Sequence, residues 1–299
     1  MIAFDPRLTP ARPDLAAAHL RGKVEAPDYV EGRPARIREG VAGLRRAPNF
    51  EASLDTQALF GEEATLYEDE EGWGWIQLTR DGYVGYVSMN ALDMNSLDMN
   101  ALDESRAAPT HRVRVNQSFV YPCPDMKLPI LDALPLGAAV RVIDAGGGFA
   151  RIAEANYVYA EHLAPLETSE PDFVATAERF LHAPYLWGGK TSFGVDCSGL
   201  VQISLQAAGI SAPRDTDLQE KALGVPLDLS GASTSLRRGD IVFWPGHVGL
   251  MRNETELLHA NAHHMLVASE PLAAARERIA AAGAQITSIR RLKSPDADL

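Results

Sequence analysis

Two stretches of this 299-residue chain repeat one pattern of short β-prone runs broken by turn signals. Residues 59–92 can be laid over residues 135–166, so that Gly61 matches Gly137. In the first copy the runs EEATLYE, WGWIQLT and YVGYVS are separated by DEEG and RDG, as expected for a small antiparallel barrel. The repeat therefore predicts two tandem β-barrels and leaves the rest of the chain for a different fold.

Changes in this pattern divide the chain into predicted segments. They are an N-terminal extension over residues 1–35, a first barrel over 36–105, a second barrel over 106–167 and a further domain over 168–299. The first barrel segment ends in the five-residue repeat ALDMNSLDMNALDES. Because the leucines of this repeat fit neither the helical nor the strand period, we interpret it as a linker or loop insertion.

Helical patterns open the last segment. SEPDFVATAERFLHA combines a capping residue with an apolar stripe, and a second helix is expected from Cys197 to Ala208, with Gly209 at its C′ position. The short apolar runs GDIVFW, HVGLM and ELLHAN are separated by turn signals, as in an antiparallel sheet. Together with the helix PLAAARERIAAAG and the strand AQITSIRRL, they predict an α+β domain.

The charge and composition of the chain limit its partners. A formal charge of −12 and a pI near 5.1 disfavour nucleic acid and anionic membrane surfaces, and they favour a substrate that carries amines. No apolar run approaches the ~20 residues of a membrane-spanning helix, and the start MIAFDPRLTPARPDLAAAHLRGK does not resemble a secretory signal, so we expect a cytoplasmic protein. Two cysteines make neither a disulfide framework nor a four-ligand zinc site, and no metal or cofactor is expected. The oligomeric state stays open.

Cys197 is the candidate nucleophile. It stands in GVDCSGL at the predicted start of a helix, where the helix dipole and free N–H groups favour the thiolate. His247 and His259 lie in strand-like runs at equal distances from Asn253, so in a hairpin centred there both imidazoles emerge on one face. One can act as the base and the other can orient it. The alternative is that the cysteine is a small core residue and that the histidines are packed or surface side chains.

The blocks PYLWGGKTSFGVDCSGLVQISLQAAGI, APRDTDLQ, RRGDIVFWPGHVGLM and LLHAN resemble the successive motifs of the NlpC-type cysteine peptidases, papain-like enzymes that cut murein peptides. The resemblance covers most of residues 171–261. It implies an α+β catalytic domain in which a helix bearing the cysteine packs on an antiparallel sheet. It also implies that Cys197 is the nucleophile, His247 the base and His259 the residue that orients the base. The two upstream barrels are then SH3-like, as in the γ-D-glutamyl-L-diamino-acid endopeptidases of this family.

The same resemblance assigns further residues to the site. Tyr185 of PYLWGG would approach the nucleophile and help to hold the tetrahedral intermediate, with a packed aromatic as the alternative. Positions that line the pocket for L-Ala-γ-D-Glu are matched by Asp196, Ser198, Asp215 and Thr216. The family has Ser where Thr216 stands, and a helix N-cap is the alternative role for this threonine.

The first barrel supplies the remaining candidates. In the similar endopeptidases this barrel helps to close the active-site groove, where an aromatic hydroxyl and a carboxylate meet the free amine of the substrate's L-Ala. The best matches are Tyr83 and Glu51, with Tyr86 and Asp55 as second choices. The alternative is that Tyr83 packs inside the barrel and that both acids are solvated.

These observations predict a cytoplasmic cysteine peptidase of murein recycling. The resemblance alone implies the substrate: a murein peptide with a free N-terminal L-Ala, in which the enzyme hydrolyses the bond between γ-D-Glu and a diamino acid, meso-diaminopimelate or Lys, and releases L-Ala-γ-D-Glu. A thiol amidase or acyltransferase on the same core is one alternative, because the catalytic residues would be shared. A non-catalytic module that binds peptidoglycan fragments is the other.

Overall fold

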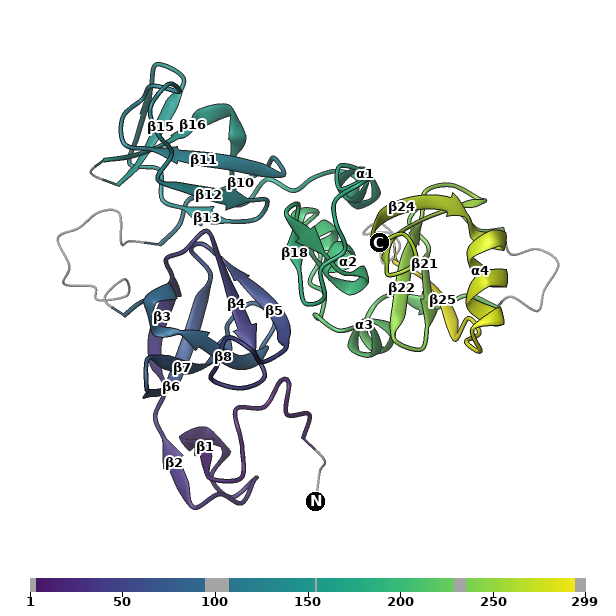
Figure 1. Cartoon of the computed structure of the whole chain (residues 1–299), viewed down its shortest axis with the longest axis horizontal. Coiled ribbons are helices and arrows are strands. Elements are labelled where there is room, and N and C mark those ends of the chain that lie inside the picture. Colours follow the sequence, from purple (N-terminus) through teal and green to yellow (C-terminus); the bar gives the residue numbers. More distant parts are fainter. Residues whose placement is uncertain (1–3, 95–107, 154, 229–234, 294–299) are drawn as a thin grey trace. The chain divides into compact units, whose positions relative to one another are not determined.

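The computed structural model describes residues 4–94, 108–153, 155–228 and 235–293 (Figure 1). The chain divides into two units, Met1–Thr168 and Ser169–Leu299. The five-residue repeat interpreted as a linker lies outside the described residues from residue 95 onward. None of the helices in the described part of the chain has the length and apolar character that crossing a bilayer requires.

The first barrel is a seven-stranded antiparallel sheet in the first unit, with the strand order β5-β4-β8-β7-β6-β3-β9. Its strands are β3 (Arg33–Ile37), β4 (Val41–Arg45), β5 (Leu54–Leu59), β6 (Glu63–Glu70), β7 (Trp73–Leu78), β8 (Val84–Ser88) and β9 (Leu92–Asp93). Burial alternates along the strands, as their two-residue period requires, and β8 buries Gly85 and Val87 between partly exposed neighbours. A hydrophobic core that includes Leu44 and Ile76 fills the interior.

A second all-β module follows in the same unit and has its own core, which includes Val113, Leu134 and Val158. Its strands are β10 (His111–Val113), β11 (Gln117–Tyr121), β12 (Asp132–Pro135), β13 (Ala139–Val140), β14 (Asp144–Gly146), β15 (Phe149–Ala153), β16 (Asn156–Tyr159) and β17 (Leu163–Pro165). They form the sheets β13-β10-β17 and β12-β11-β16-β15-β14. Gly61 and Gly137, which the sequence repeat pairs, both have positive φ, +81° and +89°, so the two copies share a turn geometry that favours glycine.

The N-terminal extension lies on the first barrel. It forms a parallel pair, β1 (Leu15–Ala17) with β2 (Asp28–Val30). The Arg12 guanidinium stacks 4.7 Å from the ring centroid of Trp75, and Arg12 Nη1 donates a hydrogen bond of 3.0 Å to the Tyr86 hydroxyl. Short 3₁₀ helices occupy Ala18–Leu20, Met89–Ala91 and Ala160–His162. The extension is therefore packed against the barrel through a cation–π contact.

The second unit packs helices against an antiparallel sheet, as predicted (Figure 1). The sheet has the order β20-β25-β21-β22-β23-β24, with β20 (Val225–Pro226), β21 (Ile241–Trp244), β22 (His247–Met251), β23 (Glu256–Asn261), β24 (Leu266–Pro271) and β25 (Ser288–Arg291). The helices are α1 (Phe173–Glu178), α2 (Cys197–Ala207), α3 (Thr216–Ala222) and α4 (Leu272–Ala281), and the hairpin β18 (Lys190–Thr191) with β19 (Gly194–Val195) precedes α2. Gly209, beyond the end of α2, has a φ of +76°, which confirms the predicted C′ glycine. Helix α2 lies against β22 and β23 and so carries its first residue to the sheet.

The sequence Asp-Cys-Ser-Gly explains why α2 begins at Cys197. The Asp196 carboxylate is the N-cap: its Oδ1 accepts a hydrogen bond of 2.7 Å from the Gly199 amide, and its Oδ2 accepts one of 2.8 Å from the Gly188 amide. A Cβ at Gly199 would lie 2.2 Å from the carbonyl oxygen of Gly189, so the glycine permits the close approach of the helix to the preceding loop. The Asp196 N-cap and the close approach at Gly199 together place Cys197 in the first turn of α2.

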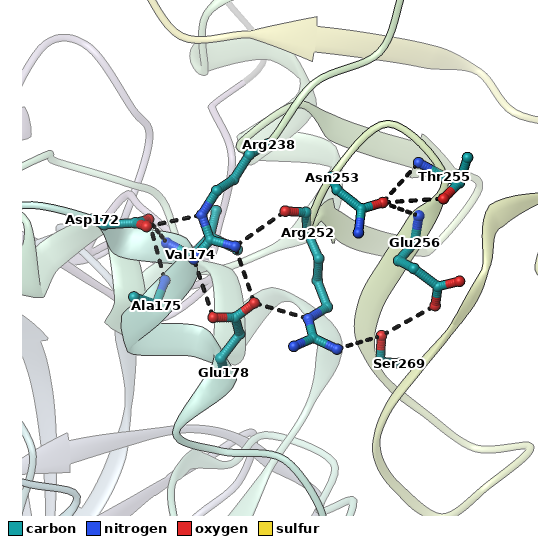
Figure 2. Close-up of polar contacts among 10 residues, drawn as sticks. All are labelled: Asp172, Val174, Ala175, Glu178, Arg238, Arg252, Asn253, Thr255, Glu256 and Ser269. Atoms are coloured by element: carbon teal, nitrogen blue, oxygen red, sulfur yellow. Dashed lines mark hydrogen bonds and ion pairs between the residues drawn. The ribbon is translucent and has the colours of Figure 1, made fainter.

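A polar network holds the turn between β22 and β23, the strands that carry the two candidate histidines (Figure 2). Asn253 Oδ1 accepts hydrogen bonds from the Thr255 amide at 2.9 Å and from the Glu256 amide at 2.9 Å. Arg252 Nη1 donates to Ser269 Oγ at 3.0 Å and so joins the turn to β24. The asparagine side chain replaces backbone partners at the start of the turn, as Asx turns do.

The network continues to helix α1 through two arginines (Figure 2). Arg238 Nε donates to the Asp172 carboxylate at 2.8 Å, and Arg238 Nη1 donates to Glu178 at 3.0 Å and to the carbonyl oxygen of Arg252 at 3.1 Å. Arg252 Nε reaches the same Glu178 carboxylate at 2.8 Å. The two guanidinium groups, that of Arg238 first, hold the pKa of Glu178 below its ordinary value. The helix side of the unit is thereby tied to the strands of the sheet.

Candidate active site

Strands β22 and β23 bring the two predicted histidines into direct contact. His247 Nε2 lies 2.8 Å from His259 Nδ1, and the ring centroids are 5.1 Å apart. The indole of Trp244, opposite His247 in the sheet, packs 5.5 Å from the His247 ring. His259 is buried, whereas His247 is half-buried. The hairpin therefore joins a half-buried imidazole to a buried one, an arrangement compatible with a predicted base and a residue that orients it.

The register of this hairpin differs from the predicted one. Leu250 pairs with Leu258 and Met251 with Leu257, so the hairpin is centred on residue 254 rather than on Asn253. Continuing this register places His259 opposite Gly249, and His247 is a diagonal neighbour of His259 on the same face. The prediction of a shared face was confirmed, and the prediction of direct opposition was wrong, because Asn253 starts the turn instead of occupying its centre.

Replacing Gly249 by alanine is expected to destabilise the second unit by about 1–3 kcal/mol. An added Cβ would lie 2.8 Å from Leu257 Cδ1 and 3.1 Å from His259 Cβ, so the Leu257 side chain would have to shift and His259 would be pushed from its place in the pair. Chemical denaturation of the full chain measures the free energy of unfolding. Gly146→Ala is the control, because a Cβ there meets no atom within 4 Å. An unchanged free energy for Gly249→Ala would contradict the tight contact.

Cys197 is buried at the start of α2, and burial decides its protonation. Burial and, second, the charge of Asp196 raise the pKa of the thiol to about 11, while a hydrogen bond from the main chain of Val248 and one with Thr216 act in the opposite direction. The expectation that the helix start lowers this pKa was therefore wrong for the unliganded protein, since desolvation outweighs the helix terminus. Sγ lies 3.9 Å from Thr216 Oγ1.

The two imidazoles are also held neutral. Burial, followed by the neighbouring His259, lowers the pKa of His247 to about 3, and burial lowers the pKa of His259 to about 4. Cysteine and base thus rest as a thiol and a neutral imidazole, and a thiolate requires transfer of the cysteine proton. The hydrogen bond of Cys197 with the main chain of Val248, the residue after His247, joins the start of α2 to β22, the strand that carries His247.

Two predicted pocket residues take part in a buried ion-pair network around Arg214, which the sequence analysis missed. Arg214, 1% exposed, donates to both Asp196 oxygens, at 3.0 and 2.6 Å, and to Ser198 Oγ at 2.8 Å. Asp196 and Ser198 are themselves buried beside the nucleophile. The available signal was the basic residue of APRDTDLQ, directly before Asp215. The network therefore places a buried ion pair, Arg214 with Asp196, directly before Cys197 in the site.

Of the other predicted residues, Thr216 is the one whose hydroxyl contacts the sulfur of Cys197. Thr216 is the first residue of α3, and Asp215 is its N-cap, so the alternative of a threonine N-cap was wrong. Gln219, in the next turn, donates from Nε2 to the carbonyl oxygen of Ser198 at 2.9 Å and ties α3 to α2. Tyr185 is half-buried, and its pKa is raised first by burial and next by the charge of Cys197.

The candidate residues of the first barrel differ in their exposure to solvent. Tyr83 is 4% exposed and belongs to the hydrophobic core of the first barrel, as the alternative interpretation stated. Two residues further along β8, Tyr86 is only half-buried, and its hydroxyl accepts from Arg12. Glu51 is exposed between β4 and β5, and Asp55 pairs with Arg46 at 2.9 Å. The burial of Tyr83 leaves Tyr86 as the better aromatic candidate.

One group in the described part of the chain has the chemistry of a metal site. Single donor atoms of His259, His264 and Glu270 lie within 4.8 Å of one another. Both oxygens of Glu270, however, accept hydrogen bonds from Arg278, at 2.6 and 2.5 Å, and a guanidinium at this place opposes a bound cation. We therefore interpret the group as an extension of the histidine pair.

A helix with a cysteine in its first turn, packed on an antiparallel sheet that carries two hydrogen-bonded histidines, defines the papain-like fold class. Residues 182–279 match the NlpC/P60 family, and residues 44–92 match the bacterial dipeptidyl-peptidase SH3 domain. The chain therefore carries a bacterial SH3 domain followed along the sequence by an NlpC/P60 domain, which confirms the resemblance drawn from the sequence motifs.

Curated relatives share both parts of the chain. The γ-D-glutamyl-L-lysine dipeptidyl-peptidase of Bacillus subtilis is 28% identical over 234 residues, 69% of this chain and 72% of that protein. The protein of the same name from Bacillus cereus is 24% identical over 229 residues, 69% of this chain and 67% of that protein. The crystal structure of an NlpC/P60 family protein from Bacillus cereus has a TM-score of 0.70 at 20% identity and covers 86% of this chain and 99% of that one, which shows a common fold.

Proposed function

We propose that the protein is a cysteine peptidase that hydrolyses the bond between γ-D-Glu and a diamino acid in murein peptides and releases L-Ala-γ-D-Glu. The observation that carries the proposal is Cys197 at the start of α2, beside a strand whose His247 is hydrogen-bonded to His259. All three residues lie inside the segment that matches the NlpC/P60 family. Relatives named for γ-D-glutamyl-L-lysine cleavage support the choice of bond.

The proposed reaction has two steps. Cys197 Sγ attacks the γ-carbonyl of D-Glu as its proton passes to His247, and the resulting tetrahedral intermediate loses the amine, which takes the proton from His247. The thioester left on the cysteine is then hydrolysed by a water that the same imidazole deprotonates. The Tyr185 hydroxyl and the free N–H groups at the start of α2 stabilise the negative oxygen in both steps.

The ion pair of Arg214 with Asp196 is proposed to hold two of the pocket residues in place. The buried guanidinium donates to both Asp196 oxygens and to Ser198 Oγ, so the Asp196 carboxylate already balances its charge. Asp215 and Thr216, at the start of α3, complete the proposed pocket next to the sulfur.

The first barrel is proposed to select peptides with a free N-terminal L-Ala. Tyr86 and Glu51 are the candidate partners of the ammonium group, with Tyr86 in place of the buried Tyr83. Such an amine is free only after the peptide has been released from muramic acid, so the proposed setting is recycling of released murein peptides in the cytoplasm. The diamino acid is meso-diaminopimelate or Lys.

Mass spectrometry of L-Ala-γ-D-Glu-meso-diaminopimelate and of its N-acetylated form tests both parts of this proposal. The wild-type protein is expected to release L-Ala-γ-D-Glu from the free peptide and to leave the N-acetylated peptide intact. Tyr86→Ala and Glu51→Gln are each expected to reduce this preference about 10-fold or more, because an ammonium group loses a hydrogen-bonding partner. Absence of cleavage of the free peptide and of its Lys analogue would refute the peptidase proposal, and equal cleavage of the free and N-acetylated forms would refute the selectivity alone.

A further inference from the structure

The histidine pair continues into two residues that the sequence motifs do not include. Glu270, on β24, places Oε1 2.9 Å from His259 Nε2, the ring nitrogen that faces away from His247. Arg278, on α4, donates two hydrogen bonds to the Glu270 carboxylate, Nη1 to Oε2 at 2.6 Å and Nη2 to Oε1 at 2.5 Å. His247, His259, Glu270 and Arg278 therefore form one continuous chain of hydrogen bonds across β22, β23, β24 and α4.

Donors and acceptors along this chain can be assigned in only one way. Arg278 can only donate, so both oxygens of Glu270 accept. His259 Nε2 then carries the hydrogen, and in a neutral ring Nδ1 keeps its lone pair. Because His259 Nδ1 accepts, His247 Nε2 carries the hydrogen and His247 Nδ1 is left as the basic nitrogen. The tautomer of His247, the proposed base, is thus determined by Arg278, which acts through Glu270 and His259.

The charges along the chain act in the same direction. The two hydrogen bonds from Arg278 lower the pKa of Glu270 to about 2, so its carboxylate stays ionised at neutral pH. Burial lowers the pKa of both imidazoles, and so do Arg278, His259 in the case of His247, and His264 in the case of His259, whereas the charge of Glu270 raises both pKa values. The carboxylate is the one neighbour named here that favours a positive charge on the imidazoles. It therefore stabilises the protonated state that His247 reaches when it takes the cysteine proton.

We propose that Glu270 is a positioning residue of the peptidase, which fixes the tautomers of His259 and His247 so that His247 presents a basic Nδ1, and that Arg278 holds Glu270 in its accepting form. The inference rests on the proposed function for its kinetic consequence, and the tautomers themselves can be observed without any substrate. A purely structural ion pair between β24 and α4 would join the same two residues but would leave the ring tautomers unchanged.

Glu270→Gln separates these two explanations. The amide oxygen is expected to keep accepting from Arg278, which turns the amide N–H₂ toward His259 Nε2 and makes that nitrogen an acceptor. His259 Nδ1 and then His247 Nδ1 would carry hydrogens, so the base would be blocked. The ¹⁵N chemical shifts of the ring nitrogens in the free protein distinguish protonated from unprotonated nitrogens. We expect Nε2–H tautomers at both histidines in the wild type and Nδ1–H tautomers in the variant.

Turnover of the free tripeptide supplies the second readout. Glu270→Gln is expected to lower kcat by roughly 10- to 100-fold, the range seen when a partner behind a functional histidine is lost, and to leave KM within about 2-fold. Glu277→Gln makes the same change at an exposed position of α4 and should match the wild type in both readouts. Arg278→Gln should give an intermediate loss, because Glu270 keeps its place but loses the donors that hold its oxygens as acceptors.

The outcomes keep the inference apart from the proposed function. Unchanged ring tautomers in Glu270→Gln would overturn the positioning role even if turnover fell, since a fall without a tautomer change indicates a structural effect. A changed tautomer with an unchanged kcat would overturn it as well. If the wild-type protein cleaved no peptide, the peptidase proposal would fail, and the ¹⁵N shifts together with the alkylation rate of Cys197 in the free protein would still decide whether Glu270 controls the pair.

Discussion

Replacement of Cys197 by serine is expected to abolish turnover of the tripeptide, by about four orders of magnitude or more, while the protein stays folded. The hydroxyl is close in volume to the thiol and can keep its contact with Thr216, so packing at the start of α2 is preserved. It is a far weaker nucleophile, because transfer of its proton to His247 is much less favourable. Release of L-Ala-γ-D-Glu, followed by mass spectrometry, measures the loss.

The other cysteine of the chain provides the matched control. Cys123 is exposed in the first unit, so Cys123→Ser should retain wild-type turnover. Circular dichroism and the free energy of unfolding of both variants test whether the fold is intact. Residual turnover of Cys197→Ser above about one hundredth of the wild-type rate would move the nucleophile to another residue.

His247→Ala is expected to reduce kcat by about 10³- to 10⁴-fold, since general base catalysis contributes up to this amount. Its imidazole is the group that takes the cysteine proton in the proposed mechanism, and the thiol pKa of about 11 leaves almost no thiolate at neutral pH without it. Part of the loss should be recovered as the pH is raised toward 11, because hydroxide then ionises the thiol of the variant directly, although the proton that His247 gives to the leaving amine is still missing. The pH dependence of kcat for the variant and the wild type measures this convergence.

A control for this experiment is His263→Ala, which removes an exposed imidazole outside the histidine pair. His259→Asn should be milder than His247→Ala, because an amide can still hold His247 Nε2 by a hydrogen bond. A loss that stayed constant from pH 7 to pH 10 would contradict a thiol that ionises only through its base.

The contribution of sequence reasoning is clearest at Cys197. The N-cap aspartate before it, the glycine two residues after it and the apolar period of the helix are all local features, so the start of α2 followed from the motif. The shared face of His247 and His259 followed from strand parity, which survives a register error of two positions. Their direct opposition did not, because register depends on which residues the turn uses.

Residues outside the motifs were beyond this kind of reasoning. Arg214 and Glu270 occupy unremarkable positions in the sequence, and their roles depend on which buried groups the fold brings against them. The same holds for Tyr83, which directly precedes β8, and for Tyr86, which lies within it. A local pattern of aromatic residues did not decide which of them enters the barrel core, whereas packing buries Tyr83.

The sequence by itself determined Cys197 as the candidate nucleophile and placed His247 and His259 on one face, because a cap, a helix period and strand parity are set by neighbours along the chain. The resemblance to the NlpC-type peptidases implied which histidine is the base and which orients it. The tertiary structure alone decided the protonation of these groups and the hydrogen-bonding partners of His259 on the side away from His247. Burial raises the pKa of the Cys197 thiol and lowers that of the His247 imidazole, and a carboxylate from β24 with a guanidinium from α4 sets the hydrogen positions of the pair. Desolvation and hydrogen bonding depend on atoms that are distant in sequence, and only the packed unit brings those atoms together.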